Sequence, residues 1–316
     1  MLKKIIQLWI LVLVTFIHQS FAKNVTRIAF GSCNNQNHQQ PLWPVIIEKK
    51  PDLFIWGGDN VYAETTDPDK IATAYQIQDS HPEYRHFKEL TPIIGIWDDH
   101  DFAYDNARGN YPFKKESQKK FLSFINESID SPRWKREGIY TSYIYPSGNQ
   151  NIKIILLDNR YHKDIDPNYP MLGKKQWEWL EHELTNSNAS LHIIASGLSM
   201  ISPKLPITDE WADYPQELLR LKNLIKKLKV RFPLLISGDK HFSSIIEKDG
   251  LIEFMSSGMT HSTPRSVRKF LRTQYKNTYF GLNFGLIDIQ WNGSRPYIRL
   301  SIIDKRGQAV VKKEYN

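Results

Sequence analysis

The chain has 316 residues, with 42 Lys and Arg against 34 Asp and Glu, which gives a formal net charge of +8 at pH 7. This length suits one large domain or two ordinary ones, and the lack of a Pro/Gly/Ser-rich linker or an internal repeat favours one. The single cysteine excludes an intramolecular disulfide framework. A nucleic-acid-binding surface would need clustered basic residues interleaved with aromatic ones, and the best candidate, at residues 265–272, has the spacing of a solvated helix face.

The first 22 residues have the pattern of a cleavable secretory signal. Lys3 and Lys4 precede an apolar run at residues 5–17, and the small residues Ser20 and Ala22 stand before the expected cleavage site. A membrane anchor is the main alternative, but the run is shorter than the roughly 20 residues that span a bilayer. We therefore expect cleavage after Ala22, a mature domain at residues 23–316 without a transmembrane segment, and a periplasmic or secreted location.

Hydrophobic periodicity predicts an alternation of strands and helices over the first three quarters of the chain. We expect strands at 25–30, 52–56, 93–97, 140–145, 152–157, 191–195, 233–236, 245–247 and 252–255. The intervening helices are expected at 41–49, within a broken helical pattern at 69–90, and at 114–127, 173–185 and 215–229. This alternation is typical of a mixed sheet that helices cover on both faces.

The last quarter of the chain has a different pattern. A polar segment at 256–272 contains Arg265, Arg268 and Arg272 at the spacing of a solvated helix face. A β-meander at 284–291, 296–303 and 309–313 then ends the chain. These C-terminal strands are expected to form a second sheet packed against the first.

Polar residues that can bind ligands follow five of the predicted strands. They are Cys33, Asp59, the run Asp98-Asp99-His100-Asp101, the pair Asp158 and Arg160, and the pair Asp239 and His241. Ligands of open α/β sheets bind outside the carboxyl ends of the strands, so these side chains are expected to converge in one crevice. Several carboxylates in one crevice would repel one another, and bound cations would remove that repulsion. The pattern therefore indicates a metal site.

Each of these signals has a purely structural alternative. The Gly58-Asp59 pair could be a turn with an Asx cap, and the acidic run at 98–101 could be a solvated loop. Asp239 could cap a helix, and Cys33 could be a small buried hydrophobe. The combination is more specific than its parts, because every member follows the carboxyl end of a strand.

Seven segments of the sequence resemble the alkaline phosphatase D (PhoD-like) family of metallophosphoesterases. They are FGSCN, LFIWGGDNVYAE, IWDDHDFAYDN, LLDNRYH, GKKQWEWLEHEL, LISGDKHFS and EFMSSGMTHS, in the order of the family and over residues 25–265. The resemblance implies an α/β fold, a four-layer α/β/β/α sandwich of two mixed β-sheets. No N-terminal accessory β-domain precedes these segments, so a compact member with the catalytic domain alone is expected.

The resemblance also implies a dinuclear metal site. Its ligands would be Cys33, Asp59, Tyr62, Asp99, Asp239 and His241. Cys33, Asp59, Tyr62 and His241 would hold Fe³⁺, and Asp59 would bridge to Ca²⁺ or another divalent cation held by Asp99 and Asp239. Oxygen ligands suit such a hard cation. After the DDHD run, relatives often read Gly, any residue, Asn, Asp. The exchange to Asp105 and Asn106 would add charge at the second metal.

The same resemblance assigns catalytic and substrate-binding residues. His100 would stabilise the transition state or protonate the leaving oxygen, and Arg160 would clamp the phosphate oxygens. Asn60, Asp101, Asp158 and His261 are further candidates for substrate contacts. Two cations would lower the pKa of a bound water, and the resulting metal-bound hydroxide would attack phosphorus in line.

We therefore predict an exported metal-dependent phosphoric-ester hydrolase of the alkaline phosphatase or phosphodiesterase type. Its substrate would be a small molecule, a lipid or a wall polymer, and the choice between monoester and diester stays open. The alternatives are a phospholipase-type phosphodiesterase, a non-catalytic binding protein with a degenerate site, and a Cys/His hydrolase with Cys33 as nucleophile. We expect a monomer that binds no sequence-specific nucleic acid.

Overall fold

The computed structural model describes residues 24–164, 171–205 and 208–316. The predicted signal at residues 1–22 lies outside the described residues and stays a prediction. No helix in the described part of the chain is both long and apolar enough to cross a bilayer.

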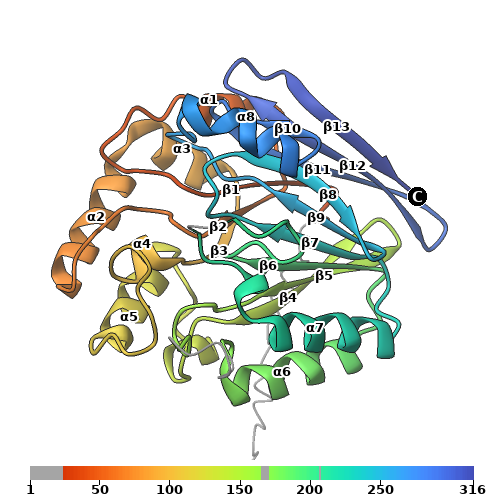
Figure 1. The fold of residues 1–316 in the computed structure, drawn as a ribbon, viewed down its shortest axis with the longest axis horizontal. Helices are drawn as coiled ribbons and strands as arrows, with labels where there is room; N and C mark the ends of the chain where they lie inside the picture. The colour runs from red at the N-terminus through yellow and green to blue at the C-terminus, as the bar shows by residue number, and fades with distance from the viewer. Residues whose placement is uncertain (1–23, 165–170, 206–207) are drawn as a thin grey trace, which may run out of the picture.

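Thirteen strands in the described ranges form two mixed sheets (Figure 1). The six-stranded sheet has the order β13-β12-β11-β1-β2-β3. Its strands are β1 (Arg27–Gly31), β2 (Leu53–Gly57), β3 (Ile93–Ile96), β11 (Asn283–Asn292), β12 (Arg295–Asp304) and β13 (Ala309–Tyr315). The strands β1, β2 and β3 run parallel, whereas β11 pairs with β1 in the antiparallel direction.

The seven-stranded sheet has the order β10-β8-β9-β7-β6-β5-β4. Its strands are β4 (Thr141–Ser147), β5 (Gln150–Leu156), β6 (Leu191–Ser196), β7 (Pro233–Ser237), β8 (Ser243–Lys248), β9 (Leu251–Met255) and β10 (Thr278–Tyr279). Its central strands β5, β6, β7 and β9 are parallel. The carboxyl ends of β5 and β7, like those of β1 to β3, are followed by predicted site residues.

Eight α-helices in the described ranges accompany the two sheets, and most of them cover the outer faces. They are α1 (Leu42–Lys49), α2 (Pro68–Ser80), α3 (Pro82–Leu90), α4 (Asp99–Phe102), α5 (Lys114–Phe124), α6 (Gly173–Thr185), α7 (Pro215–Lys227) and α8 (Arg265–Gln274), with short 3-10 turns at Pro132–Trp134 and Trp211–Asp213. Figure 1 shows α6 and α7 along the seven-stranded sheet, where Trp177 and Leu180 are fully buried. On the six-stranded sheet Trp43 of α1 packs on Trp56 of β2, with a ring distance of 5.4 Å.

The inner faces of the two sheets meet in the main core. Phe30 of β1 contacts Phe254 of β9 edge to face, with their ring centroids 4.8 Å apart. Both rings are fully buried, as apolar side chains on the inner faces of packed sheets must be. The predicted four-layer α/β/β/α class is thereby confirmed.

The predicted division of strands between the sheets is wrong. The C-terminal strands β11 to β13 extend the sheet of β1, and the second sheet is formed by the middle of the chain. Periodicity identifies a strand but not its partner, and β11 pairs with β1 across most of the sequence. The helical pattern at 69–90 is two helices, because Pro82 holds His81 in an extended conformation between them.

Candidate metal centre

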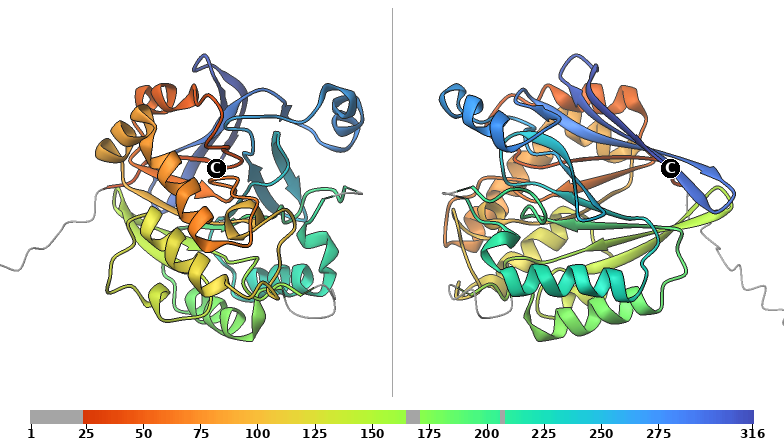
Figure 2. Two further views of the ribbon diagram at one scale, coloured as in Figure 1. Left: turned by 90° about the vertical axis from the view of Figure 1, so that its left-hand side faces the viewer. Right: turned by 45° about the vertical axis from the view of Figure 1, so that its right-hand side comes forward.

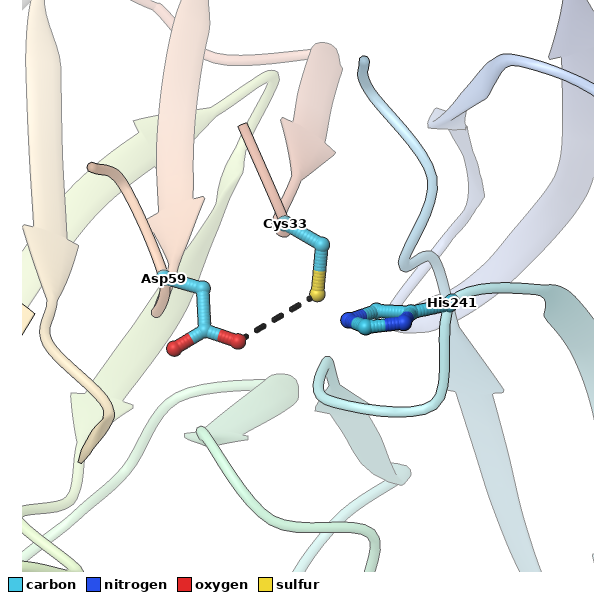
Figure 3. A group of neighbouring side chains, drawn as sticks. All are labelled: Cys33, Asp59 and His241. Carbon is cyan, nitrogen blue, oxygen red and sulfur yellow. Dashed lines mark hydrogen bonds between the residues drawn. The ribbon is translucent and has the colours of Figure 1, made fainter. Parts of the chain in front are cut away.

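Three loops bring Cys33, Asp59 and His241 together after β1, β2 and β7 (Figure 3). The Cys33 Sγ atom lies 3.4 Å from Oδ2 of Asp59. Each of the three residues offers one ligand atom, and these atoms all lie within 4.8 Å of one another. The Cys33 thiol is fully buried, so it faces only this group and its immediate neighbours. Thiolate, carboxylate and imidazole are all good ligands for a transition metal.

A second group adjoins the first and shares Asp59 with it. Asp59, Asp98, Asp99 and Asp239 offer ligand atoms that lie within 4.8 Å of one another. Among the described residues, Oδ1 of Asp59 and Oδ2 of Asp98 are buried without a hydrogen-bond partner, and the buried Oδ2 of Asp239 has an ion pair with Nζ of Lys240 at 3.5 Å but no hydrogen bond. Buried polar atoms are almost always paired, so these oxygens fit a ligand supplied from outside the chain. The two groups fit a pair of cations that Asp59 would bridge.

The backbone at this centre is held in an unusual conformation. Cys33, Asp59, Asp239 and His241 all have positive φ angles, of 58°, 50°, 72° and 58°. Residues other than glycine adopt this region at a cost, and they are concentrated at functional sites. Gly58 also has a positive φ, and a Cβ atom there would lie 2.8 Å from Cβ of Asp98. The loops are therefore shaped to aim these side chains at one another.

Crowding of the acids changes their proton affinity. Burial, together with the negative charge of Cys33 and the neighbouring aspartates, raises the pKa of Asp59 well above its ordinary value. Burial also raises the pKa of Asp98 to about 6, even though Arg160 opposes the shift. A bound cation would oppose these shifts, because it favours the ionised carboxylates.

The thiol and the imidazole shift in opposite directions. Burial raises the pKa of Cys33, but the adjacent His241 outweighs it, so the net pKa lies below the ordinary value for a thiol. Burial lowers the pKa of His241, yet Cys33 and Asp239 raise it to about 9. His241 thus favours the thiolate form of Cys33, which is the form of cysteine that binds metals.

Tyr62 lies beside this pair. Its hydroxyl is 3.1 Å from Nε2 of His241 and 3.0 Å from Nε2 of His261, and its ring stacks on His100 at 4.2 Å. Burial and the charges of Cys33 and Asp59 raise the pKa of its phenol well above 10. The structure therefore places the phenol oxygen at the first group, as the resemblance implies for a ligand.

The guanidinium of Arg160 is engaged within the protein. This fully buried side chain pairs with Asp98, with Asp99 at 3.2 Å and with Asp209 at 3.1 Å. Its three nitrogen atoms thus all have carboxylate partners. The position favours a role in holding Asp98 and Asp99, and the predicted clamp on phosphate stays a prediction.

His100 follows Asp99 and has a partner that the sequence did not indicate. Its Nδ1 atom contacts a carboxylate oxygen of Glu64, and 16% of the histidine side chain is exposed. Burial lowers the pKa of His100, but Asp99 and Glu64 outweigh it and raise the pKa above 6.5. Glu64 lies in the loop after β2 within the quoted GDNVYAE stretch, yet nothing in its spacing pointed to His100.

Two of the residues predicted to contact substrate, Asp158 and Asp101, instead accept hydrogen bonds from other residues of the protein. Asp158 accepts hydrogen bonds from Trp97 and from the backbone of Ile139, Arg160 and Tyr161. Asp101 accepts bonds from Asn60, from Tyr75 and from the backbone of Asp98. Both carboxylates are buried and orient the loops behind the metal ligands. The structure does not bring them into the cluster.

The other two candidates lie closer to the centre. Asn60 donates to Ile96 and Asp101, while its buried Oδ1 has no hydrogen-bond partner among the described residues. His261 contacts Tyr62, and burial followed by the charge of His241 lowers the pKa of His261 to about 3, so it is neutral. Asp105 and Asn106, the exchanged pair, line a cavity beside the centre. The backbone N–H of Asn106 donates to Oδ2 of Asp99.

Comparison with known proteins gives one family. The sequence pattern of the family described as PhoD-like phosphatase matches residues 141–306. Alkaline phosphatase D of Bacillus subtilis (strain 168) is 24% identical over 270 residues, an alignment that covers 68% of this chain and 46% of the relative. The chain thus spans about half the length of that curated relative.

Solved structures share the fold. A structure of PhoD has a TM-score of 0.70 at 17% identity, covering 93% of this chain and 72% of the other. GAP50, named as the anchor in the inner membrane complex of Plasmodium, has a TM-score of 0.61 at 13% identity, with 93% and 89% covered. A purple acid phosphatase from yellow lupin seeds has a TM-score of 0.60 at 15% identity, with 92% and 53% covered. At these identities the likeness establishes the fold alone.

Proposed function

This chain belongs to the PhoD-like phosphatase family, and from that premise we propose that it is an exported, metal-dependent phosphoric-ester hydrolase with a dinuclear centre. The observation that carries the proposal is the position of Asp59. It is the residue common to both groups of ligand atoms, and its buried Oδ1 has no hydrogen-bond partner among the described residues. A bridging carboxylate with an oxygen for each cation accounts for both facts.

The two halves of the centre differ in ligand chemistry. Cys33, Tyr62, His241 and Asp59 would hold the first cation, and thiolate and phenolate donors suit Fe³⁺. Asp59, Asp99 and Asp239 would hold the second, and donors that are all oxygen suit Ca²⁺. When bound, the cations would supply Lewis-acid chemistry, lowering the pKa of water and neutralising charge on the phosphoryl group.

The chain's own residues orient the reacting groups. Glu64 holds the His100 ring and, with Asp99, favours its protonated form, so His100 can donate a proton to the leaving alcohol oxygen. Arg160 fixes Asp98 and Asp99 from behind and leaves Oδ2 of Asp98 without a hydrogen-bond partner among the described residues. The proposed ligands and the proposed proton donor thus lie on loops that follow strands or, for Asp99 and His100, at the start of α4.

Iron content, colour and turnover test the proposal together. The purified protein should contain iron, show a visible charge-transfer band, and hydrolyse bis-p-nitrophenyl phosphate faster with Ca²⁺ than without it. Cys33→Ser should lose the band and the activity, because the thiolate ligand is gone. Ser199→Ala, a buried change away from the ligands, should keep both.

The rival functions give different results. A colourless protein without bound metal that hydrolyses acyl esters would replace the proposal by a Cys33 nucleophile. A protein that binds the metals but leaves every phosphate ester intact would point to a non-catalytic binding role.

A further inference from the structure

A cavity of about 470 Å³ opens beside the metal centre. Its polar end contains Asp99, His100, Asp239 and His241. Its other wall is formed by Leu205, Phe242, Pro264, Val267, Phe270 and Leu271. The volume lies within the usual range of small-molecule sites, and one such site normally combines a few polar groups with an apolar lining. The polar end is explained by the proposed function, whereas the apolar wall is not.

Val267, Phe270 and Leu271 of this wall belong to α8, which stands off the two sheets (Figure 2). Leu271, together with the neighbouring Tyr275, anchors the helix in a small core around Phe242 and Phe280. Phe242 stacks on Phe280 at 5.2 Å and meets Tyr275 edge to face at 4.9 Å. This core holds one side of α8 and leaves other apolar side chains of the helix outside it.

Val267 and Phe270 are those side chains. They are 40% and 50% exposed, and both line the cavity. Large exposed apolar side chains that are gathered in one place mark a binding surface more often than scattered ones do. Both side chains line the same cavity as the predicted metal ligands. A molecule bound at the metal centre would therefore be the one that contacts them.

The helix is fixed relative to the metal ligands. The Thr263 amide donates to the carbonyl of His241 at 2.8 Å, and the Thr263 hydroxyl donates to the same oxygen at 2.9 Å. Phe242 is the next residue after His241 and belongs to the core that holds α8. The distance from the apolar wall to the centre is therefore set by the fold.

The cavity lining also includes the basic side chain of Lys240, whereas the basic residues of α8 lie outside this lining. Arg268 and Arg272 of α8 lie over the Phe280 ring, at 5.8 and 5.2 Å, and Arg265 and Lys269 are exposed on the same helix. An apolar wall beside a centre that would bind the phosphate favours a molecule that is both anionic and partly apolar. A small polar phosphate would gain nothing from Val267 and Phe270.

We propose that this cavity binds an extended apolar group of the substrate, so that the preferred substrates are phosphate esters of alcohols with a long alkyl or aryl chain. The inference rests on the proposed function for the position of the phosphate. It adds the chemical class of the alcohol and assigns Val267 and Phe270 as residues that determine specificity.

Alkylphosphonates, which the enzyme cannot hydrolyse, test the subsite by binding alone. Affinities of methyl-, butyl- and octylphosphonate for the metal-loaded protein are measured by calorimetry below the micelle concentration. We expect a gain of about twofold to fourfold for each buried methylene, with a negative heat-capacity change for octylphosphonate. Phe270→Ser and Val267→Ser should reduce the gain but leave methylphosphonate affinity unchanged.

Leu219→Ser is the matched control, since Leu219 is 53% exposed on α7 and does not line this cavity. Equal affinity for the methyl and octyl compounds would overturn the proposal, and so would a gain that survives in both α8 variants. Hydrolysis of p-nitrophenyl methyl and octyl phosphate is measured in parallel. Binding that depends on chain length without any hydrolysis would support the subsite while refuting the proposed function.

Discussion

Two buried carboxylates show how differently this fold treats an acid. Glu253 on β9 accepts hydrogen bonds from the backbone of Met200, Ile201 and Ser202 and from the hydroxyls of Ser202 and Ser237. Asp59 is equally buried, but one of its oxygens has no hydrogen-bond partner in the described part of the chain, and its neighbours are other acids. Glu253 is satisfied by the chain, whereas Asp59 keeps an oxygen that an external cation could bind.

The largest effect is expected at Asp59. Asp59→Asn should lower kcat/KM by at least about 10³-fold, the scale on which one electrostatic stabiliser of a transition state acts. The free energy of unfolding in chelator should not fall, because the amide removes repulsion among the acids. Kinetics with a phosphate diester and urea unfolding measure the two quantities. A variant that loses stability but keeps its activity would show that Asp59, like Glu253, has a structural role.

Glu253→Gln should give the opposite result. The side-chain NH2 group of the glutamine would replace a carboxylate oxygen and cannot accept from the backbone N–H groups that face it. We expect this to lower the free energy of unfolding by about 3 kcal/mol. The kcat/KM of the folded fraction should stay unchanged. Tryptophan fluorescence in urea follows the stability, and a variant as stable as the wild type would show that Glu253 is not a structural anchor.

Glu64→Gln tests an acid of a third kind, which is proposed neither as a metal ligand nor as a structural anchor but contacts the ring of His100. We expect kcat to fall about 10- to 100-fold, less than the full contribution of a general acid. Loss of the carboxylate charge lowers the pKa of His100, so the alkaline limb of the pH–rate profile should move to lower pH.

The matched control for this variant is Glu48→Gln, an exposed position on α1 at the other end of the sheet. It should leave the profile unchanged. A uniform loss of activity in Glu64→Gln without a shift of the limb would mean that Glu64 has a purely structural role.

The smallest effect is expected at His192, a buried histidine whose neutral form is hydrogen-bonded within the chain. His192 contacts the Arg231 carbonyl and the Ser187 hydroxyl, and burial lowers its pKa below 6.5. The unfolded chain therefore binds a proton that the folded chain does not, and stability falls as the pH drops below 6.5. The free energy of unfolding is measured between pH 5 and pH 8 for the wild type and His192→Gln, both in chelator. It should fall toward pH 5 more steeply in the wild type than in the variant. Parallel curves would contradict it.

The centre was predictable where the sequence places polar residues directly after apolar strands. Cys33, Asp59 and His241 follow β1, β2 and β7, and parallel strands bring such positions to one edge. Arg160 follows the same rule, but its engagement by Asp98, Asp99 and Asp209 depends on side-chain geometry that spacing does not contain. The rule thus finds the neighbourhood of a residue but not its partner.

Other features were beyond the sequence for the same reason. The pairing of β11 with β1 is a tertiary choice, so the meander was assigned to the wrong sheet. Glu64 lies in a loop without periodicity, and the contact to His100 depends on how two loops meet. The pattern of α8 drew attention to its arginines as a solvated face, whereas Val267 and Phe270 line the cavity.

The pairing of β1 with β11 also bears on the order of folding. Arg27 and Asp288 are bonded across 261 positions of sequence, and contacts of such long range form slowly. Cys33 stands at the end of β1, while its partner His241 comes more than two hundred residues later. During synthesis the lone thiol is therefore made long before its metal-binding partner, and a delay at that stage would leave it open to oxidation.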